Sequence, residues 1–276
     1  MGPNMYESYW KLTQKPFENC CDPRFYFPDE SHQAALLKLR YAIENRRGAA
    51  LLAGASGSGK TLVVGMLRTM LGDTCAPFVH LVYPQMATDE LLAYLAGELT
   101  GTLETQTPSV QQSVRQIEHF LAGNAQQGRH AVVAVDEAHL LGDSQTLEAL
   151  RLLLNFQPEG QQGLTLLLVG QPGILPMLDH LPQLEERLAV KCLLRPLNQQ
   201  ETAQYVTHRL KAAGAARTIF DAPALETLHR LTHGVPRRIN RLCDLSLLIG
   251  YAEERTSIGS SQIEAISEEL VTVVPE

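Results

Sequence analysis

The chain has 276 residues, of which 45% are hydrophobic and 19% are charged, and its formal net charge is −7 at pH 7. This length suits one large domain with a smaller one, and the composition is that of an ordinary soluble globular protein. The acidic balance gives no general attraction to nucleic acid or anionic membranes, although it leaves room for a local basic patch. No apolar run approaches the roughly 20 residues that span a bilayer, and the N-terminus does not resemble a signal peptide.

The cysteines point to a reducing compartment. There are five, and none are spaced as Cys-x-x-Cys: Cys20, Cys21, Cys75, Cys192 and Cys243. The odd count and the spacing argue against a zinc site and favour a cytoplasmic location. The adjacent Cys20 and Cys21 are compatible with a strained disulfide, but two ordinary thiols are the simpler interpretation.

Residues 1–30 are rich in aromatic residues and proline, which predicts an irregular segment packed on the rest of the protein. A helix is predicted from about Ser31 to the Arg46-Arg47-Gly48 sequence, because cations suit the negative helix end and glycine suits the cap. Its apolar face is predicted to carry Ala34, Leu37 and Tyr41.

Five short apolar runs then predict strands at residues 49–53, 78–82, 131–135, 164–169 and 190–194. Helical patterns separate most of them, at residues 88–99, 109–122 and 144–154. Near-continuous apolar strands that alternate with helices predict an α/β fold, a parallel five-stranded sheet covered on both faces.

After Pro196 no further strand is predicted. Asn198 and Glu201 have the spacing of a capping box, and further helices are predicted to begin near Asp221, Arg237 and Ser260. We therefore expect residues 1–196 to form an α/β core with an N-terminal extension and residues 197–276 to form a small all-helical domain.

The strongest motif is a glycine-rich sequence between the first predicted strand and a helix. It matches the phosphate-binding pattern G-x-x-x-x-G-K-[ST], in which glycines let backbone N–H groups converge on phosphates and the helix N-terminus favours an anion. The lysine is expected to reach the β- and γ-phosphates of ATP, and Thr61 to bind Mg²⁺. The nucleotide-binding residues predicted here are Gly54, Ala55, Ser56, Gly57, Ser58, Gly59, Lys60, Thr61 and Leu62.

Two acids follow the third predicted strand. Together with the phosphate loop upstream, this acidic motif completes the pair of motifs that nucleotide hydrolysis requires. Asp136 is expected to hold Mg²⁺, directly or through water, and Glu137 to activate the attacking water. The following His139 invites a helicase interpretation, which we discount because no second α/β domain follows. We interpret His139 as a local hydrogen-bonding residue.

Three further side chains are weaker candidates. Gln171 follows the fourth strand and is predicted to contact the γ-phosphate or to cap the next helix, with equal support. Arg187, predicted on a helix before the last strand, is a candidate finger for a neighbour's γ-phosphate, although an intrahelical salt bridge is the simpler role. Arg237 is a candidate for contacting bound nucleotide, and the nearby Arg238 and Arg241 suit a solvated basic face or a polyanion contact.

The order of these motifs resembles the AAA+ ATPases, and the resemblance to general secretion pathway protein A ATPases covers essentially the whole chain. The matching segments are residues 5–12, 16–17, 23–26, 31–36, 168–172 and 194–197. The resemblance implies that Asp136 and Glu137 are the Walker B acids, Gln171 the first sensor and Arg237 the second sensor. It also implies that aromatic residues near Phe25 lie by the adenine.

The resemblance implies a cytoplasmic, self-assembling ATPase that acts as a switch on a protein partner of the secretion or envelope machinery. Secretion-type members commonly continue into a membrane helix and a periplasmic peptidoglycan-binding region, which these 276 residues lack, so we expect a stand-alone relative or an isolated cytoplasmic domain. The alternative function is an ATP-dependent DNA-binding target selector, which the acidic balance disfavours. A scaffold without turnover is disfavoured by Glu137.

Overall fold

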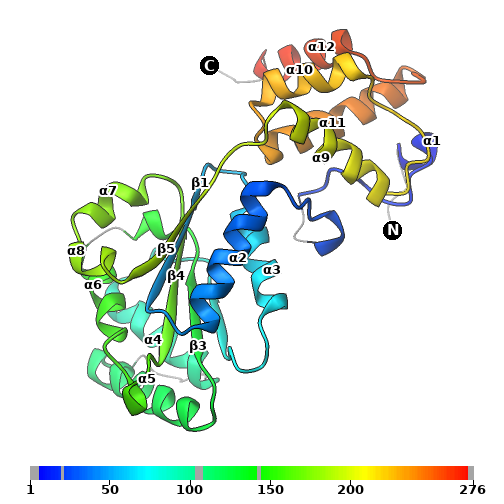
Figure 1. Cartoon of the computed structure of the whole chain (residues 1–276). Coiled ribbons are helices and arrows are strands. Elements are labelled where there is room, and N and C mark those ends of the chain that lie inside the picture. Colours follow the sequence, from blue (N-terminus) through cyan, green and yellow to red (C-terminus); the bar gives the residue numbers. More distant parts are fainter. Residues whose placement is uncertain (1–5, 20–21, 103–107, 142–143, 273–276) are drawn as a thin grey trace. The chain divides into compact units, whose positions relative to one another are not determined.

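The computed structural model describes residues 6–19, 22–102, 108–141 and 144–272. The chain divides into two compact units, of which the first comprises residues 1–30, 57–62 and 195–276 and the second residues 31–56 and 63–194. The second unit contains the sheet and the first is helical (Figure 1). Cys20, Cys21 and Met5 lie outside the described residues.

The sheet of the second unit has five parallel strands in the order β2-β3-β4-β1-β5. Their bounds are β1 Ala49–Gly54, β2 Phe78–Leu81, β3 Ala131–Val135, β4 Leu164–Gly170 and β5 Leu188–Leu194. Each coincides with a predicted apolar run, so the α/β fold with a five-stranded parallel sheet is confirmed. β1, β3 and β4 are buried along their whole length, as expected for strands covered on both faces.

Helices cover both faces of this sheet (Figure 1). On one face lie α2 (Glu30–Glu44) and α3 (Lys60–Met70). The other face packs into a hydrophobic core with α4 (Thr88–Thr100), α5 (Val110–Gln126), α6 (Ser144–Leu153), α7 (Ile174–Asp179) and α8 (Pro182–Glu185). The short 3₁₀ turns η2 (Ala138–Leu140) and η3 (Pro158–Gly160) connect strands and helices on this side.

The predicted apolar face of α2 was wrong. Leu37 and Tyr41 are 72% and 51% exposed, whereas Leu36, Leu39 and Ile43 are buried. Both sets have helical spacing, so α2 carries two apolar stripes, and periodicity alone does not decide between them. The stripe that is buried, on a helix that covers the sheet, is the one with Leu36, Leu39 and Ile43.

The predicted glycine cap of α2 was also wrong. Arg46 takes the left-handed conformation (φ +50°), and its N–H donates to the Ile43 carbonyl at 2.9 Å. The N–H of Arg47 donates to the Ala42 carbonyl at 2.8 Å. These bonds satisfy the last helical carbonyls before the chain reaches Gly48.

The first unit contains four main helices, α9 (Gln199–Ala212), α10 (Ala222–Thr232), α11 (Pro236–Ala252) and α12 (Ser260–Thr272). The predicted capping box is present: Asn198 Oδ1 accepts from the Glu201 N–H, and Glu201 Oε2 accepts from the Asn198 N–H, both at 2.8 Å. Asp221 Oδ1 likewise accepts from the Ala224 N–H at 2.8 Å, so the polar residues that begin these helices were predicted correctly.

The N-terminal segment belongs with these helices, which corrects its predicted place in the α/β core. Its short elements are α1 (Glu7–Trp10) and η1 (Pro23–Phe25). Arg209 of α9 is buried and donates to the carbonyls of Pro16 at 2.6 Å and Glu18 at 2.7 Å. Five side chains of the segment join the helical core: Tyr6, Trp10, Leu12, Phe17 and Phe25.

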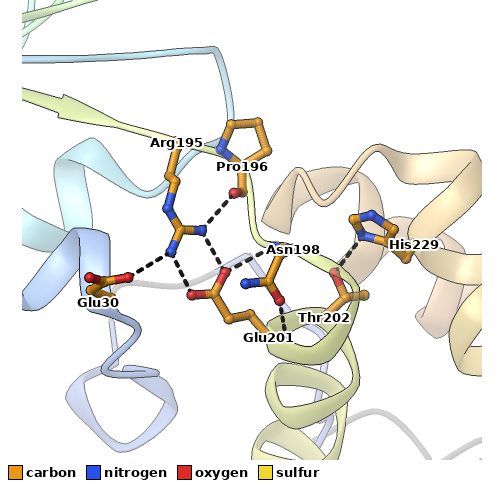
Figure 2. Close-up of polar contacts among 7 residues, drawn as sticks. All are labelled: Glu30, Arg195, Pro196, Asn198, Glu201, Thr202 and His229. Carbon is orange, nitrogen blue, oxygen red and sulfur yellow. Dashed lines mark hydrogen bonds and ion pairs between the residues drawn. The ribbon is translucent and has the colours of Figure 1, made fainter.

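An ion-pair cluster follows β5, beside the predicted boundary at Pro196 (Figure 2). The guanidinium of Arg195 donates to both carboxylate oxygens of Glu201, at 2.6 and 2.8 Å, and to Glu30 at 3.3 Å. The hydrogen bonds from the Arg195 guanidinium lower the pKa of the Glu201 carboxyl. Because Glu201 also caps α9, the cluster fixes where that helix begins.

Replacing Trp10 by alanine is expected to lower the free energy of unfolding of the helical unit by about 3–5 kcal/mol. The indole is fully buried, its Nε1 donates to the Leu247 carbonyl at 2.8 Å, and a Cβ at Gly250 would lie 2.9 Å from its ring. Urea denaturation followed by circular dichroism measures the change. Tyr83→Ala, at an exposed aromatic residue, is the control and should change stability by less than about 0.5 kcal/mol.

Candidate nucleotide-binding site

The predicted phosphate loop joins β1 to α3, which begins at Lys60. Gly57 and Gly59 have φ values of +77° and +95°, a conformation that residues with a Cβ rarely adopt. Lys60 and Ser58 are buried, at 5% and 3% exposure. The loop therefore has the glycine-dependent turn into a helix N-terminus that a polyphosphate requires.

Within the helical unit, the tight turn of this loop touches the start of α11. The backbone N–H of Arg237 donates to the Gly57 carbonyl at 3.2 Å. Arg237 is in the first turn of its helix, where N–H groups have no partner inside the helix, so Gly57 supplies one. A Cβ added at Gly57 would lie 2.5 Å from the Cβ of Arg237.

Gly57→Ala is therefore expected to weaken ATP binding by about tenfold or more, because strain of this kind costs about 1–3 kcal/mol. The new Cβ meets a backbone-fixed atom of α11 in addition to the unfavourable φ. Titration with a fluorescent ATP analogue measures the effect. Gly65→Ala in α3 is the control, since a Cβ there meets nothing within 4 Å.

In the sheet unit, the predicted acids and Gln171 lie at one edge of the sheet. β4 lies between β3 and β1, so the carboxyl ends that precede Asp136, Gln171 and the phosphate loop are neighbours. Adjacent strands are about 4.8 Å apart. The structure thus brings Asp136, Glu137 and Gln171 together, at the edge where parallel α/β sheets bind ligands.

Glu137 adopts a strained backbone conformation directly after β3. Its φ is +49°, in the left-handed region that costs a residue with a side chain about 1–2 kcal/mol. The N–H of Glu137 donates to Asp136 Oδ1 at 2.9 Å, which stabilises the turn. Asp136 is nearly buried, whereas the Glu137 side chain is 41% exposed. Strained turns of this type are concentrated at functional sites.

Two histidines at this edge join the site. Nδ1 of His139 accepts the N–H of Gln171 at 3.3 Å. The same nitrogen lies 3.4 Å from Glu137 Oε2, so His139 is next to both residues. The local hydrogen-bonding role expected for His139 matches this geometry. Because a Cβ at Gly170 would lie 3.3 Å from the His139 N–H nitrogen, glycine there permits the approach.

His80 was missed by the sequence interpretation. Its Nε2 lies 3.4 Å from Asp136 Oδ2, across the neighbouring strands β2 and β3. The available signal was a polar residue inside an otherwise apolar strand, which does not identify a partner far along the chain. The Nε2 nitrogen is buried and makes no hydrogen bond to the described residues, so its contact with Asp136 is one of proximity.

Arg187 is not on a helix, which corrects the prediction. α8 ends at Glu185, and Arg187 lies in the turn before β5. One of its terminal guanidinium nitrogens, Nη2, donates to Asn155 Oδ1 at 2.6 Å, and its carbonyl accepts from the N–H of Ala49. Ala49 begins β1, so Arg187 is at the amino edge of the sheet, opposite the edge that carries Asp136. It does not join the site of its own sheet.

Comparison with known proteins agrees with these features. A family model described as "AAA domain" matches residues 43–178. General secretion pathway protein A of Aeromonas hydrophila is 35% identical over 251 residues, which are 90% of this chain and 45% of that protein. The chain belongs to the AAA+ ATPases. Within this family it is related to general secretion pathway protein A, and it spans a little under half of that relative's length.

Solved structures support the AAA+ fold. Cdc6p from Pyrobaculum aerophilum matches with a TM-score of 0.71 and 16% identity, covering 94% of this chain and 74% of that one. The ORC1 protein of Aeropyrum pernix, solved in complex with DNA, matches with a TM-score of 0.68 and 15% identity over 94% and 70% of the two chains. At these identities the likeness shows the fold alone.

Two remaining features bear on the sequence predictions. Cys75, Cys192 and Cys243 are buried free thiols, and burial raises the pKa of each. Among the described helices, none combines the length and apolar character needed to cross a membrane.

Proposed function

We propose that this AAA+ protein binds and hydrolyses ATP with Mg²⁺ and uses the reaction to change the position of its helical unit against a protein partner. The observation that carries the proposal is the bond from the Arg237 N–H to the Gly57 carbonyl. A loop suited to phosphates is thereby bonded to the first turn of a long helix. A change in the loop on hydrolysis is thus transmitted to α11.

The proposed roles follow the chemistry of each side chain. The N–H groups from Gly54 to Leu62 hold the phosphates, and the ammonium of Lys60 neutralises the β- and γ-phosphates. Thr61 and Asp136 hold Mg²⁺, which shields phosphate charge when bound. The glycine conformations and the nearly buried carboxylate at a strand end fit such a ligand set.

Three residues are proposed to act on the reacting groups. Glu137 accepts a proton from the attacking water, and its partly exposed carboxylate beside the strained turn is free to reach solvent. Gln171 positions that water or the γ-phosphate through its amide. The guanidinium of Arg237 contacts bound nucleotide and reports its state to α11.

Arg187 is proposed to act on a neighbouring copy, because it is at the sheet edge opposite its own acids. The Arg187→Ala variant should bind ATP normally and hydrolyse it about 10²–10³ times more slowly, as when one transition-state donor is lost. Wild-type turnover per molecule should rise with protein concentration. A rate per molecule that stays constant over a wide concentration range, with Arg187→Ala fully active, would exclude the role.

The partner is proposed to be a protein of the secretion or envelope machinery, on the basis of the relative's name. DNA is the competing partner. Arg238 and Arg241 are exposed on α11, and the similar ORC1 structure was solved with DNA. A net charge of −7 opposes nonspecific DNA binding.

The deciding experiment uses the Glu137→Gln variant saturated with ATP and Mg²⁺, sedimented with duplex DNA at moderate salt. Self-assembly induced by ATP without DNA binding supports a protein-directed switch. ATP-dependent co-sedimentation with DNA, lost in Arg238→Ala/Arg241→Ala, would replace the proposed partner class by DNA. Assembly that is the same with and without ATP would reject the switch.

A further inference from the structure

The helical unit contains a cavity of about 190 Å³ between the end of α9 and the start of α10. Apolar cavities of roughly 150 Å³ hold a benzene-sized group, so this one has room for a leucine or phenylalanine side chain. Its apolar lining consists of two small residues, Ala215 and Ala216, and five larger ones, Val206, Leu210, Ile219, Phe220 and Leu225. All belong to the helical unit alone.

The sequence explains why the cavity is not filled from within. The connection after α9 runs Ala212, Ala213, Gly214, Ala215 and Ala216, so no side chain there extends beyond Cβ. Gly214 has φ +91°, and a Cβ there would lie 3.0 Å from Thr13 of the N-terminal segment. The connection is therefore held in place, and its short side chains leave the cavity unfilled.

Two cations flank this apolar lining. Lys211 and Arg217 line the cavity, and no carboxylate does so among the described residues. The Arg217 guanidinium lies over the ring of Trp10, 5.5 Å from its centroid, and Trp10 is itself fixed by its bond to Leu247. This contact restrains the guanidinium before any ligand arrives, which lowers the entropy cost of binding. The local positive charge is unlike that of the chain as a whole.

We propose that this cavity is a docking site for an acidic peptide segment of a partner protein. The peptide inserts one apolar side chain into the cavity, and the carboxylates belong to the peptide residues on either side of it. The apolar lining takes the leucine or phenylalanine side chain, and Lys211 and Arg217 pair with the flanking carboxylates. An apolar cavity between two cations is complementary to such a segment in both shape and charge. The site is separate from the phosphate loop, so binding does not require nucleotide.

The test uses fluorescein-labelled acetylated peptides of the sequence Glu-Asp-X-Asp-Glu, with X as Leu, Phe or Ala, and the full chain without nucleotide. Fluorescence anisotropy should show binding of the Leu and Phe peptides, about tenfold weaker binding of the Ala peptide, and no binding of a Lys-Lys-Leu-Lys-Lys peptide. Lys60→Ala should bind the peptides as wild type does. This separates the site from the proposed ATPase function.

Two variants remove one feature each. Lys211→Ala/Arg217→Ala should weaken binding of the Leu peptide about tenfold or more, whereas Arg238→Ala/Arg241→Ala removes the same charge elsewhere and should change it less than about twofold. Ala215→Leu retains both cations and should weaken binding by filling the cavity. Equal losses in the two charge variants, or no difference between the Leu and Ala peptides, would overturn the proposal. Duplex DNA that displaces the Leu peptide from Lys211 and Arg217 would overturn it in favour of a phosphate site.

Discussion

Lys60→Ala is expected to weaken ATP binding by about 100-fold or more. The ammonium at this position is proposed to bond two phosphates, and bonds to charged groups contribute about 1.5–3 kcal/mol each, so their joint loss exceeds the roughly 2.8 kcal/mol of a 100-fold change. The fold should survive, because alanine favours the first turn of α3 as well as lysine does. Titration with a fluorescent ATP analogue gives the dissociation constant.

A thermal unfolding series provides the control for Lys60→Ala. ATP should raise the melting temperature of the wild type progressively with its concentration, and Lys60→Ala should need about 100-fold more ATP for the same rise, while the two unliganded proteins melt together. Lys38→Ala removes a lysine from the exposed surface of α2 and should bind ATP as wild type does. Undiminished ATP binding by Lys60→Ala would show that the phosphate site is elsewhere.

Glu137→Gln is expected to retain ATP binding and to slow hydrolysis by about 10²–10⁴-fold, the usual contribution of a general base. The amide keeps the size of the side chain but cannot accept the proton. Since glutamine and glutamate bear the left-handed backbone at similar cost, the turn after β3 should persist. Phosphate release under saturating ATP measures turnover, and nucleotide titration measures affinity.

Glu118→Gln makes the same chemical change on the exposed side of α5 and should leave turnover within about twofold of wild type. If Glu137→Gln loses ATP affinity and turnover together, Glu137 acts in binding and not as the base. If its turnover matches that of wild type, another group activates the water. Either result would redirect the search to His139 and Gln171, the described neighbours of the turn.

Much of the fold could be predicted from local signals. The five strands are compact apolar runs, and the capping residues Ser109, Asn198 and Asp221 each bond the N–H three residues on, as their spacing indicates. The phosphate loop is equally local, because Gly57 and Gly59 must adopt positive φ values within one turn. Gln171 follows the fourth strand as predicted, and in the sheet this strand lies between β3 and β1.

Errors arose where a residue's place depends on distant parts of the chain. Arg187 was predicted on a helix, but α8 has one turn only and ends before it. The exposed stripe of α2 and its buried stripe have the same periodicity, so only the sheet distinguishes Leu37 from Leu39. The N-terminal segment was grouped with the core, although Arg209, almost 200 residues away, holds its carbonyls.

The sequence by itself determined the AAA+ class, the phosphate loop and the acids after β3, because these depend on residues adjacent in the chain. The tertiary structure alone decided which side chains that lie far apart in the sequence contact one another. It brings His80 to Asp136 and His139 to Gln171, and it places the Arg237 N–H on the Gly57 carbonyl. Such contacts form only when the strands and helices pack, so periodicity and motif spacing do not predict them.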